Sequence, residues 1–288
     1  MVTSLGVPQL KASGFRYGLN TSTLRGHKLP LTELIEITAR AGYVAIEPWI
    51  DEIDQYVSEG GSLPDLGKRI ADLGLSVEGA IGFFAWVVDD EAERKAALIE
   101  AERNMRLLQA IGGKRLAAPA FGATERNDID LSKAAERYRA LLDIGERYNV
   151  VPQVEVWGFS QTLKKMGDAA SIAIESGHPS ACILPDIYHL YKGGSGYAGL
   201  NLLHPSAIPV FHVNDYPDIA PDKISDTDRV YPGDGIAPWK TIIQTLTRTG
   251  YDGVLSLELF NPTYYAQDPF LVAQTGLQKI KDVVSRYV

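Results

Sequence analysis

Short apolar runs recur along the chain and alternate with longer stretches in which apolar residues return every three or four positions. The short runs are rich in β-branched and aromatic residues and therefore predict β-strands. Eight of them begin at Arg16, Tyr43, Leu75, Lys114, Val150, Ala181, Ile208 and Gly253. Because these runs are nearly continuously hydrophobic rather than alternating, they are typical of parallel strands that are buried on both faces.

The longer stretches have helical periodicity, and several end in glycine just before the next strand, as at residues 41–43 and 249–251. A last helix is expected over residues 269–287. Eight strands alternating with helices predict an α/β fold, a (β/α)8 TIM barrel forming a single domain over residues 15–288, preceded by a flexible arm at residues 1–14. An open doubly wound sheet is the alternative, but no strand is followed by the glycine fingerprint of a dinucleotide site.

Composition and charge narrow the range of partners. Acidic side chains outnumber basic ones by 36 to 28, and no Lys- or Arg-rich run is present to neutralise phosphates, so a nucleic acid partner is not expected. The single cysteine, Cys182, excludes an internal disulfide. No apolar run has the length of a signal peptide at the N-terminus, or the roughly 18 residues of a membrane span. We therefore expect a cytoplasmic protein without a membrane partner.

Four ionisable residues lie late in consecutive predicted strands: Glu155, Asp186, His212 and Glu258. In a TIM barrel the chemistry takes place at this carboxyl-terminal end of the strands. Each residue alone is explained by an ion pair or by a hydrogen-bonded place in the core. Together, however, the three carboxylates would be neighbours in space and would repel one another. One divalent cation resolves this repulsion, and the donor set suits Mn²⁺ first, with Mg²⁺, Co²⁺ and Zn²⁺ as alternatives.

Five further residues near the strand ends are candidates for substrate contact: His189, Arg229, Trp157, Trp86 and Glu47. His189 is placed to hydrogen-bond a sugar oxygen, although a histidine in a surface loop is the plainer explanation. Arg229 would stabilise a developing oxyanion, or would simply pair with an aspartate in the same loop. Aromatic rings beside a polar site stack on the C–H face of a sugar, and they also wall cavities that bind none.

These strand-end residues resemble those of the xylose isomerase-like TIM barrel superfamily, specifically its sugar phosphate isomerase/epimerase branch, which includes ketose 3-epimerases and inosose-pathway proteins. The resemblance covers nearly the whole chain from Arg16. Its most specific parts are EVW at Glu155, the D-x-x-H of Asp186 and His189, HVNDYP at His212, DRVYPGDG at Asp228 and LSLELF around Glu258.

The resemblance implies one divalent metal ion held by Glu155, Asp186, His212 and Glu258. It also implies an isomerase or epimerase acting on a keto sugar or polyol, phosphorylated or not. One of Glu155 and Glu258 would remove a proton beside the carbonyl, and the other would return it to a cis-enediolate. His189 and Arg229 would contact the substrate. Relatives of this kind commonly assemble as homo-oligomers through their outer helices.

The sequence departs from the epimerases at one position, and it leaves other activities open. Those enzymes carry a further glutamate six residues after the first metal ligand, where this chain has Gln161. A keto-inositol dehydratase-type lyase, which begins with the same proton abstraction, is the alternative function. A barrel that binds a polyol without turnover is a further alternative. A DNA-repair endonuclease of the superfamily is disfavoured, because its site is rich in histidine and this chain has five histidines in all.

Overall fold

Eight parallel strands run through the middle of the molecule at the positions that the hydrophobic runs indicate. The computed structural model describes residues 14–288, so the expected arm at residues 1–14 lies outside the described residues except for Gly14. The strands are β1 (Arg16–Asn20), β2 (Ala45–Glu47), β3 (Ser76–Val77), β4 (Arg115–Ala118), β5 (Val151–Glu155), β6 (Ile183–Leu184), β7 (Val210–Val213) and β8 (Val254–Leu257).

The strands pair in two parallel groups that backbone contacts join into a barrel. One group has the order β3-β2-β1-β8-β7, and the other has the order β4-β5-β6. A parallel bridge between Asp186 and His212 links β6 to β7. On the other side, the amide of Lys114 donates to the carbonyl of Val77, which links β3 to β4. The predicted TIM barrel is thereby confirmed.

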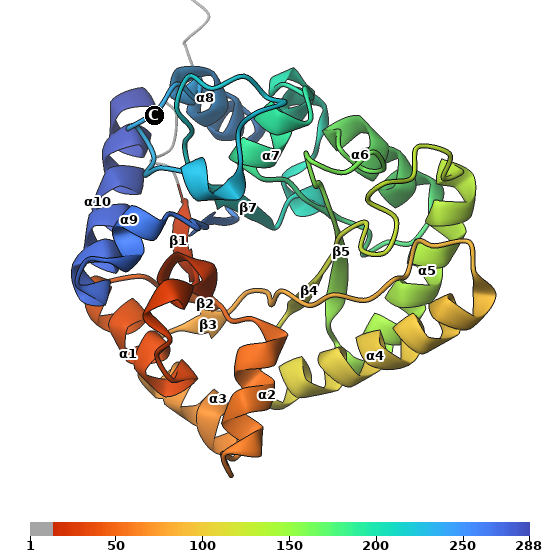
Figure 1. The fold of residues 1–288 in the computed structure, drawn as a ribbon, viewed down its shortest axis with the longest axis horizontal. Helices are drawn as coiled ribbons and strands as arrows, with labels where there is room; N and C mark the ends of the chain where they lie inside the picture. Colours follow the sequence, from red (N-terminus) through yellow and green to blue (C-terminus); the bar gives the residue numbers. More distant parts are fainter. Residues whose placement is uncertain (1–13) are drawn as a thin grey trace, which may run out of the picture.

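The helices surround these strands as an outer ring (Figure 1). They are α1 (Leu31–Ala41), α2 (Ile50–Ser58), α3 (Leu63–Asp72), α4 (Glu91–Ala110), α5 (Leu131–Tyr148), α6 (Met166–Glu175), α7 (Ile187–Lys192), α8 (Trp239–Thr249), α9 (Pro262–Tyr265) and α10 (Pro269–Tyr287). The side chains of Asp90, Asp130 and Asp268 cap the first turns of α4, α5 and α10. The sequence patterns predict α10 at its observed bounds, whereas the helices α2, α7 and α9 are additional.

Short helical turns fill several of the connections between these elements. They are the 3-10 helices η1 (Thr21–His27), η2 (Ala198–Leu202), η3 (Pro205–Ala207) and η4 (Asp226–Asp228). The predicted first strand extended through residue 22, but the chain leaves the sheet after Asn20, because the Asn20 side chain accepts a hydrogen bond from the amide of Ser22 and starts η1.

The core has an inner and an outer part, as two-sided burial of the strands predicts. Small and branched side chains fill the interior of the barrel: Ala45, Ile81, Ala117, Leu184, Val210 and Val254. Gly18 also belongs there, because a Cβ at this position would lie 2.8 Å from Cγ1 of Val254. A larger cluster lies between the strands and the ring of helices. Among the helices within residues 14–288, none combines the length and apolar character that a membrane crossing requires.

Candidate metal and substrate site

A cavity of 260 Å³ lies at the carboxyl-terminal end of the strands. Polar side chains line one part of it and aromatic side chains line the rest. The lining residues are Trp49, Ile81, Phe83, Glu155, Trp157, Phe159, His189, Asp226, Arg229, Glu258 and Phe260. Five of the residues that the sequence indicates as site residues therefore meet here: Glu155, Trp157, His189, Arg229 and Glu258.

Asp186, His212 and Glu258 form a compact group of potential metal ligands. One donor atom from each residue lies within 4.8 Å of the donor atoms of the other two. Asp186 lies two residues after the end of β6 and His212 lies in β7, and the parallel bridge between them places their side chains next to each other. Glu258 follows the last residue of β8. All three side chains are buried, so their charges need either one another or a cation for compensation.

Glu155, at the end of β5, lies beside this group without belonging to it. Its carboxyl is buried, and its Oε2 has no hydrogen-bond partner among the described residues. Burial and the nearby Glu258 carboxylate raise the pKa of Glu155 to about 8, although His212 and the Trp157 side chain lower it in part. This carboxyl is therefore a buried group that lacks the counter-charge that would keep it ionised at neutral pH.

Arg229 lies between the carboxylates on a long connection that follows β7. Its Nη1 donates to Asp186 Oδ2 at 3.0 Å and to Glu258 Oε2 at 2.8 Å, and its Nη2 pairs with Asp226 at 2.5 Å. The guanidinium also stacks over the ring of Tyr188. Burial lowers the pKa of Arg229, but the three carboxylates outweigh burial and raise this pKa. The expected ion pair with Asp226 and the expected contact with the site both exist.

His189 lies in α7 rather than in the loop that the sequence indicates. Asp186 caps this helix through a hydrogen bond from the amide of His189, at 2.8 Å. The amide of Gly158 donates to Nδ1 of His189 at 3.2 Å, and Nη2 of Arg229, which can only donate, lies 3.1 Å from Nε2. These two contacts compete for the single lone pair of a neutral ring. Burial and the charge of Arg229 both lower the pKa of His189, which favours the neutral ring.

Two predicted substrate contacts do not line the cavity. Trp86 is buried in the core, where its indole donates to the carbonyl of Pro119 at 2.7 Å and its ring packs on Tyr138. Glu47 lies behind His212, with its Oε2 3.0 Å from Nε2 of the imidazole. Phe83, three positions before Trp86, lines the cavity instead, and Glu47 contacts the potential metal ligand His212 rather than the cavity.

Aromatic rings form the outer wall of the cavity, and sequence reasoning missed most of them. Phe83 stands 5.5 Å from the ring of Trp49 and 5.8 Å from that of Trp157, centroid to centroid. Phe159 and Phe260 continue the wall on either side. Each of these residues lies within a few positions of a strand end, which is the signal that could have identified them. Gln161, where epimerases carry a glutamate, is exposed and does not line the cavity.

The residues present fit a divalent cation. Three buried carboxylates and an imidazole converge on one place, with Arg229 as the nearest guanidinium. Two buried atoms that face this place, Oε2 of the neighbouring Glu155 and Nδ1 of His212, have no hydrogen-bond partner within the part of the chain that the structure describes. Unpaired buried donors of this kind are costly unless a ligand satisfies them. Oxygen and imidazole donors suit Mn²⁺, Mg²⁺, Co²⁺ or Zn²⁺.

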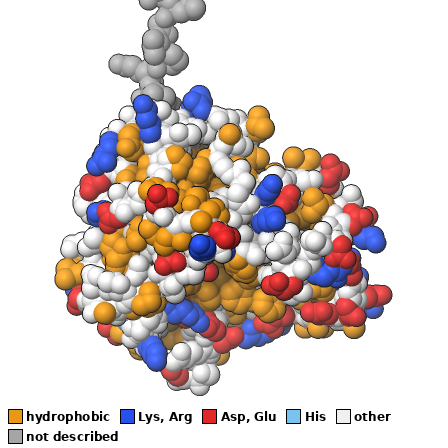
Figure 2. Space-filling view, turned by 45° about the horizontal axis from the view of Figure 1, so that its top comes forward, with side chains coloured by type: hydrophobic (Ala, Val, Ile, Leu, Met, Phe, Trp, Pro, Cys, Tyr) orange, Lys and Arg blue, Asp and Glu red, His pale blue; other side chains and the backbone are white. Residues whose placement is uncertain are grey.

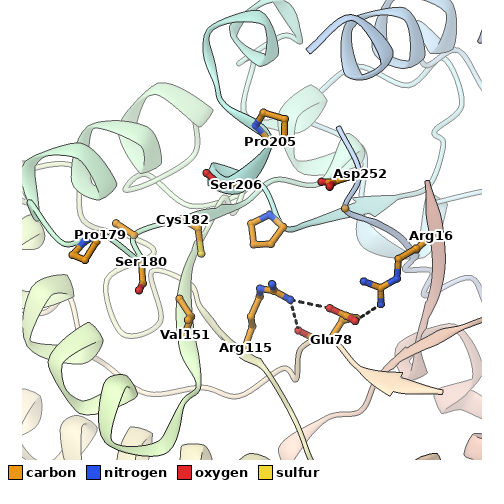
Figure 3. Close-up of a pocket in the computed structure, with 13 residues that line it drawn as sticks. Arg16, Glu78, Arg115, Val151, Pro179, Ser180, Cys182, Pro205, Ser206 and Asp252 are labelled. Carbon is orange, nitrogen blue, oxygen red and sulfur yellow. Dashed lines mark hydrogen bonds and ion pairs between the residues drawn. The ribbon is translucent and has the colours of Figure 1, made fainter. Parts of the chain in front are cut away.

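A larger cavity of 440 Å³ opens at the opposite, amino-terminal end of the barrel (Figure 3). Its buried carboxylate, Glu78, pairs with Arg16, with Lys114 at 2.7 Å and with Arg115 at 2.9 Å. Burial raises the pKa of Glu78, but the hydrogen bonds from Lys114 and Arg16 outweigh burial and lower this pKa to about 2. Because Glu78 is fully paired, this larger cavity is a weaker candidate for chemistry than the smaller one.

Neither the surface in view nor the charge distribution suggests a binding surface for a polyanion. Figure 2 shows one face of the molecule, on which hydrophobic side chains gather toward the middle while acidic and basic side chains are mixed around them. The whole chain carries a formal net charge of −8 at pH 7. A net negative charge repels a polyanion such as nucleic acid.

Comparisons with known proteins identify relatives of this chain. A family model described as a xylose isomerase-like TIM barrel matches residues 35–283. Inosose isomerase of Bacillus velezensis is 28% identical over 267 residues, which are 89% of this chain and 93% of that enzyme. 3-Dehydroshikimate dehydratase of Pseudomonas aeruginosa is 27% identical over 265 residues, 87% of this chain and 39% of that enzyme. A crystal structure of the IOLI protein with a zinc atom has a TM-score of 0.88 at 24% identity, covering 95% of this chain and 99% of that one.

Proposed function

Because this chain belongs to the xylose isomerase-like TIM barrel family, we propose that it is an isomerase or epimerase of a keto sugar or keto-polyol that works with one divalent metal ion. The observation that carries this proposal is the meeting of Glu155 and Glu258 in one cavity, beside the ligand group of Asp186, His212 and Glu258. Two carboxyls beside one substrate supply the acid and the base that movement of a proton requires.

The ion would be held by Glu155, Asp186, His212 and Glu258. When bound, it supplies Lewis-acid polarisation of the substrate carbonyl. Glu155 and Glu258 face the same cavity from β5 and β8, so one carboxylate removes the proton on the carbon beside the carbonyl and the other carboxyl returns a proton to the cis-enediolate. His189 lies beside Arg229 in the wall of the cavity, where its ring would contact a substrate oxygen. Asp226 and Tyr188 hold Arg229 toward the same region.

The walls of the cavity favour a substrate without a phosphate group. Among the described side chains that line it, Arg229 is the single Lys or Arg, and it already pairs with Asp186, Asp226 and Glu258. The aromatic wall instead offers flat apolar surfaces. A six-membered keto-polyol that presents its C–H faces to rings such as Phe83 and Trp157 satisfies both features. This agrees with the substrate that the name of the Bacillus velezensis relative indicates.

A dehydratase is the second candidate, and the Pseudomonas aeruginosa relative is the observation that favours it. A lyase of this kind begins with the same removal of a proton beside a carbonyl and then expels a hydroxyl group from the next carbon. The same pair of carboxyls, Glu155 and Glu258, would serve it, with the second carboxyl protonating the departing hydroxyl. The two activities therefore differ in the fate of the intermediate and not in the first step.

The experiment that tests the proposal is deuterium incorporation from solvent. Protein stripped of metal and reloaded with Mn²⁺, and in parallel with Zn²⁺, is incubated in D₂O with ketoses, keto-inositols, 3-dehydroshikimate and their available phosphates. NMR and mass spectrometry then follow the C–H groups beside the carbonyl. We expect metal-dependent exchange with an uncharged keto-polyol, and conversion to an isomer of the same mass apart from the deuterium.

The alternative outcomes are distinct. Exchange accompanied by loss of water would establish the dehydratase. Tight metal binding and saturable ligand binding without exchange would identify a barrel that binds a polyol without turnover. Exchange that persists in chelator-treated protein would contradict the role of the metal.

A further inference from the structure

We infer that Glu47 is a positioning residue for His212: it fixes which imidazole nitrogen faces the metal ligands and holds the ring in place. The inference rests on the proposed metal site and extends it to a residue that the sequence suggests only as a substrate contact. The two residues are 165 positions apart, and Glu47 Oε2 lies 3.0 Å from Nε2 of His212. Both side chains are buried, at 1% and 0% exposure.

The barrel brings these residues together across its interior. Glu47 is the last residue of β2 and His212 lies in β7, and β1 and β8 separate these strands in the sheet. The contact is therefore made by side chains that point inward from well-separated strands. The hydroxyl of Thr21 donates to the backbone carbonyl of Glu47 at 3.3 Å, which fixes the end of β2 from the first connection.

The contact between Glu47 and His212 determines which nitrogen of the imidazole keeps a lone pair for a metal ion. A neutral imidazole carries one N–H, and a buried carboxylate accepts only from a nitrogen that bears hydrogen. The contact of Nε2 with Glu47 has hydrogen-bond geometry, whereas the contact of Nδ1 with the Glu258 carboxylate does not, so the geometry assigns the proton to Nε2 and the lone pair to Nδ1. That nitrogen lies 3.3 Å from Oε2 of Glu258 and has no hydrogen-bond partner among the described residues. Histidine ligands in metal sites are commonly oriented in this way by an acceptor behind the ring.

Gly79 provides the space that Glu47 occupies. A Cβ at position 79 would lie 2.5 Å from Oε1 of Glu47, so any larger residue would push the carboxylate away from its place. The displaced atom is the end of a flexible side chain, so the backbone tolerates the change better than the carboxylate does. Gly79→Ala therefore disturbs the contact with His212 without removing the charge, and it complements a substitution of Glu47 itself.

The first measurement is the affinity for Mn²⁺ of the full chain, by competition with a fluorescent chelator, for the wild type, Glu47→Gln, Gly79→Ala and Glu78→Gln. Glutamine keeps the size of the side chain and removes its charge. We expect Glu47→Gln to bind Mn²⁺ about 10- to 100-fold more weakly, and Gly79→Ala to show a smaller loss in the same direction. Glu78→Gln is the matched control, because Glu78 is an equally buried carboxylate without contact to His212. Its affinity stays within about threefold of the wild type.

The second measurement separates positioning from general stability. In Zn²⁺-loaded, ¹⁵N-labelled protein, two-bond proton–nitrogen correlations show which nitrogen of each histidine carries the proton, and a His212→Asn variant assigns the signals among the five histidines. We expect a proton on Nε2 of His212 in the wild type. Glu47→Gln should change the chemical shift of that proton or lose it, whereas Glu78→Gln leaves it unchanged.

The outcomes distinguish this inference from the proposed function. A wild type that binds neither Mn²⁺ nor Zn²⁺ overturns the metal centre and the role of Glu47 with it. A wild type that binds, with Glu47→Gln and Gly79→Ala at the same affinity, overturns the role of Glu47 alone. If Glu47→Gln does not fold, the Mn²⁺ affinity of Gly79→Ala tests the role of Glu47 in its place. A proton on Nδ1 of His212 in the zinc-loaded wild type also contradicts the inference.

Discussion

Two buried glutamates lie at opposite ends of the same barrel and have opposite environments. Glu78, at the amino-terminal end, pairs with Arg16, Lys114 and Arg115, and its pKa is lowered to about 2. Glu155, at the carboxyl-terminal end, lies beside other carboxylates, and its Oε2 has no hydrogen-bond partner among residues 14–288. Its pKa is raised to about 8. Residue type and burial are the same, and only the neighbours differ.

The comparison shows that the barrel keeps stabilising ion pairs at one end and groups available for a ligand at the other. At the amino-terminal end, cations from the first residues of β1 and β4 surround one carboxylate, which ties these strands to β3. At the carboxyl-terminal end, carboxylates outnumber the cations and leave donors available for a ligand. An excess of buried carboxylates lowers the stability of the folded state, as is usual at sites that bind ligands or carry out reactions. We therefore expect substitutions at the two ends to affect different measurements.

The largest effect is expected from Glu258→Gln at the carboxyl-terminal end. Loss of this carboxylate removes both a proton-transfer group and a donor of the ligand group, so solvent exchange of the substrate proton should fall by a factor of about 10³ or more. Deuterium incorporation per folded molecule measures this. Glu78→Gln is the control and should keep exchange near the wild-type rate. Retained exchange in Glu258→Gln would remove Glu258 from the mechanism.

Glu78→Gln, at the amino-terminal end, is expected to have a large effect on stability rather than on exchange. It leaves three cations without their counter-charge and should lower the free energy of unfolding by roughly 3 kcal/mol at pH 7. Because the folded-state pKa is depressed, this contribution of Glu78 is present above the usual pKa of 4.5 and is lost as the pH falls toward 2. Urea unfolding between pH 2.5 and 7 measures both effects. A variant with unchanged stability would show that the pairs contribute nothing.

A smaller and opposite effect on stability is expected from Glu155→Gln in metal-free protein. The folded-state pKa of Glu155 is raised, so its contribution is present below the usual pKa of 4.5 and is lost as the pH rises through about 8. Glutamine cannot ionise, so the variant does not lose this stability and should be more stable than the wild type at pH 8.5 by about 1 to 3 kcal/mol. Thermal unfolding in chelator measures it.

Added Mn²⁺ should make the wild type more stable than Glu155→Gln. The wild type gains about 2.7 kcal/mol at a metal concentration of 100 times Kd, whereas a variant without the Glu155 carboxylate gains less. If the variant is less stable than the wild type even without metal, the carboxyl of Glu155 is paired in a way that the unpaired Oε2 does not indicate.

The smallest effect is expected at the aromatic wall. Phe83→Ala removes one face against which a substrate ring would pack, and KM should rise about fivefold with kcat little changed, a loss of roughly 1 kcal/mol. Steady-state kinetics measures it. Ser180→Ala, in the cavity at the amino-terminal end, is the control and should leave KM unchanged. A change in KM from Ser180→Ala would mean that the two ends are not separate in function.

Local sequence patterns were enough to predict the order of the elements and the strands that carry the site. Near-continuous apolar runs mark strands buried on both faces, and glycines after periodic stretches mark helix ends, so the barrel follows from local patterns. Since parallel strands all present their carboxyl-terminal ends at one side, Glu155, Asp186, His212 and Glu258 had to lie at the same end. Their ligand role stays a prediction.

The contacts of each of these side chains, in contrast, depend on the closed barrel and could not be read from local patterns. In sequence, the Val-Glu of residues 77–78 looks like the Val-Glu of residues 154–155, yet Glu78 meets cations and Glu155 meets carboxylates. The strands near these positions are as short as two residues, so alternation cannot tell which side chain faces inward. Phe83 rather than Trp86 therefore lines the cavity, and Glu47 contacts His212 from a strand 165 residues away, because only the closed barrel brings these groups together.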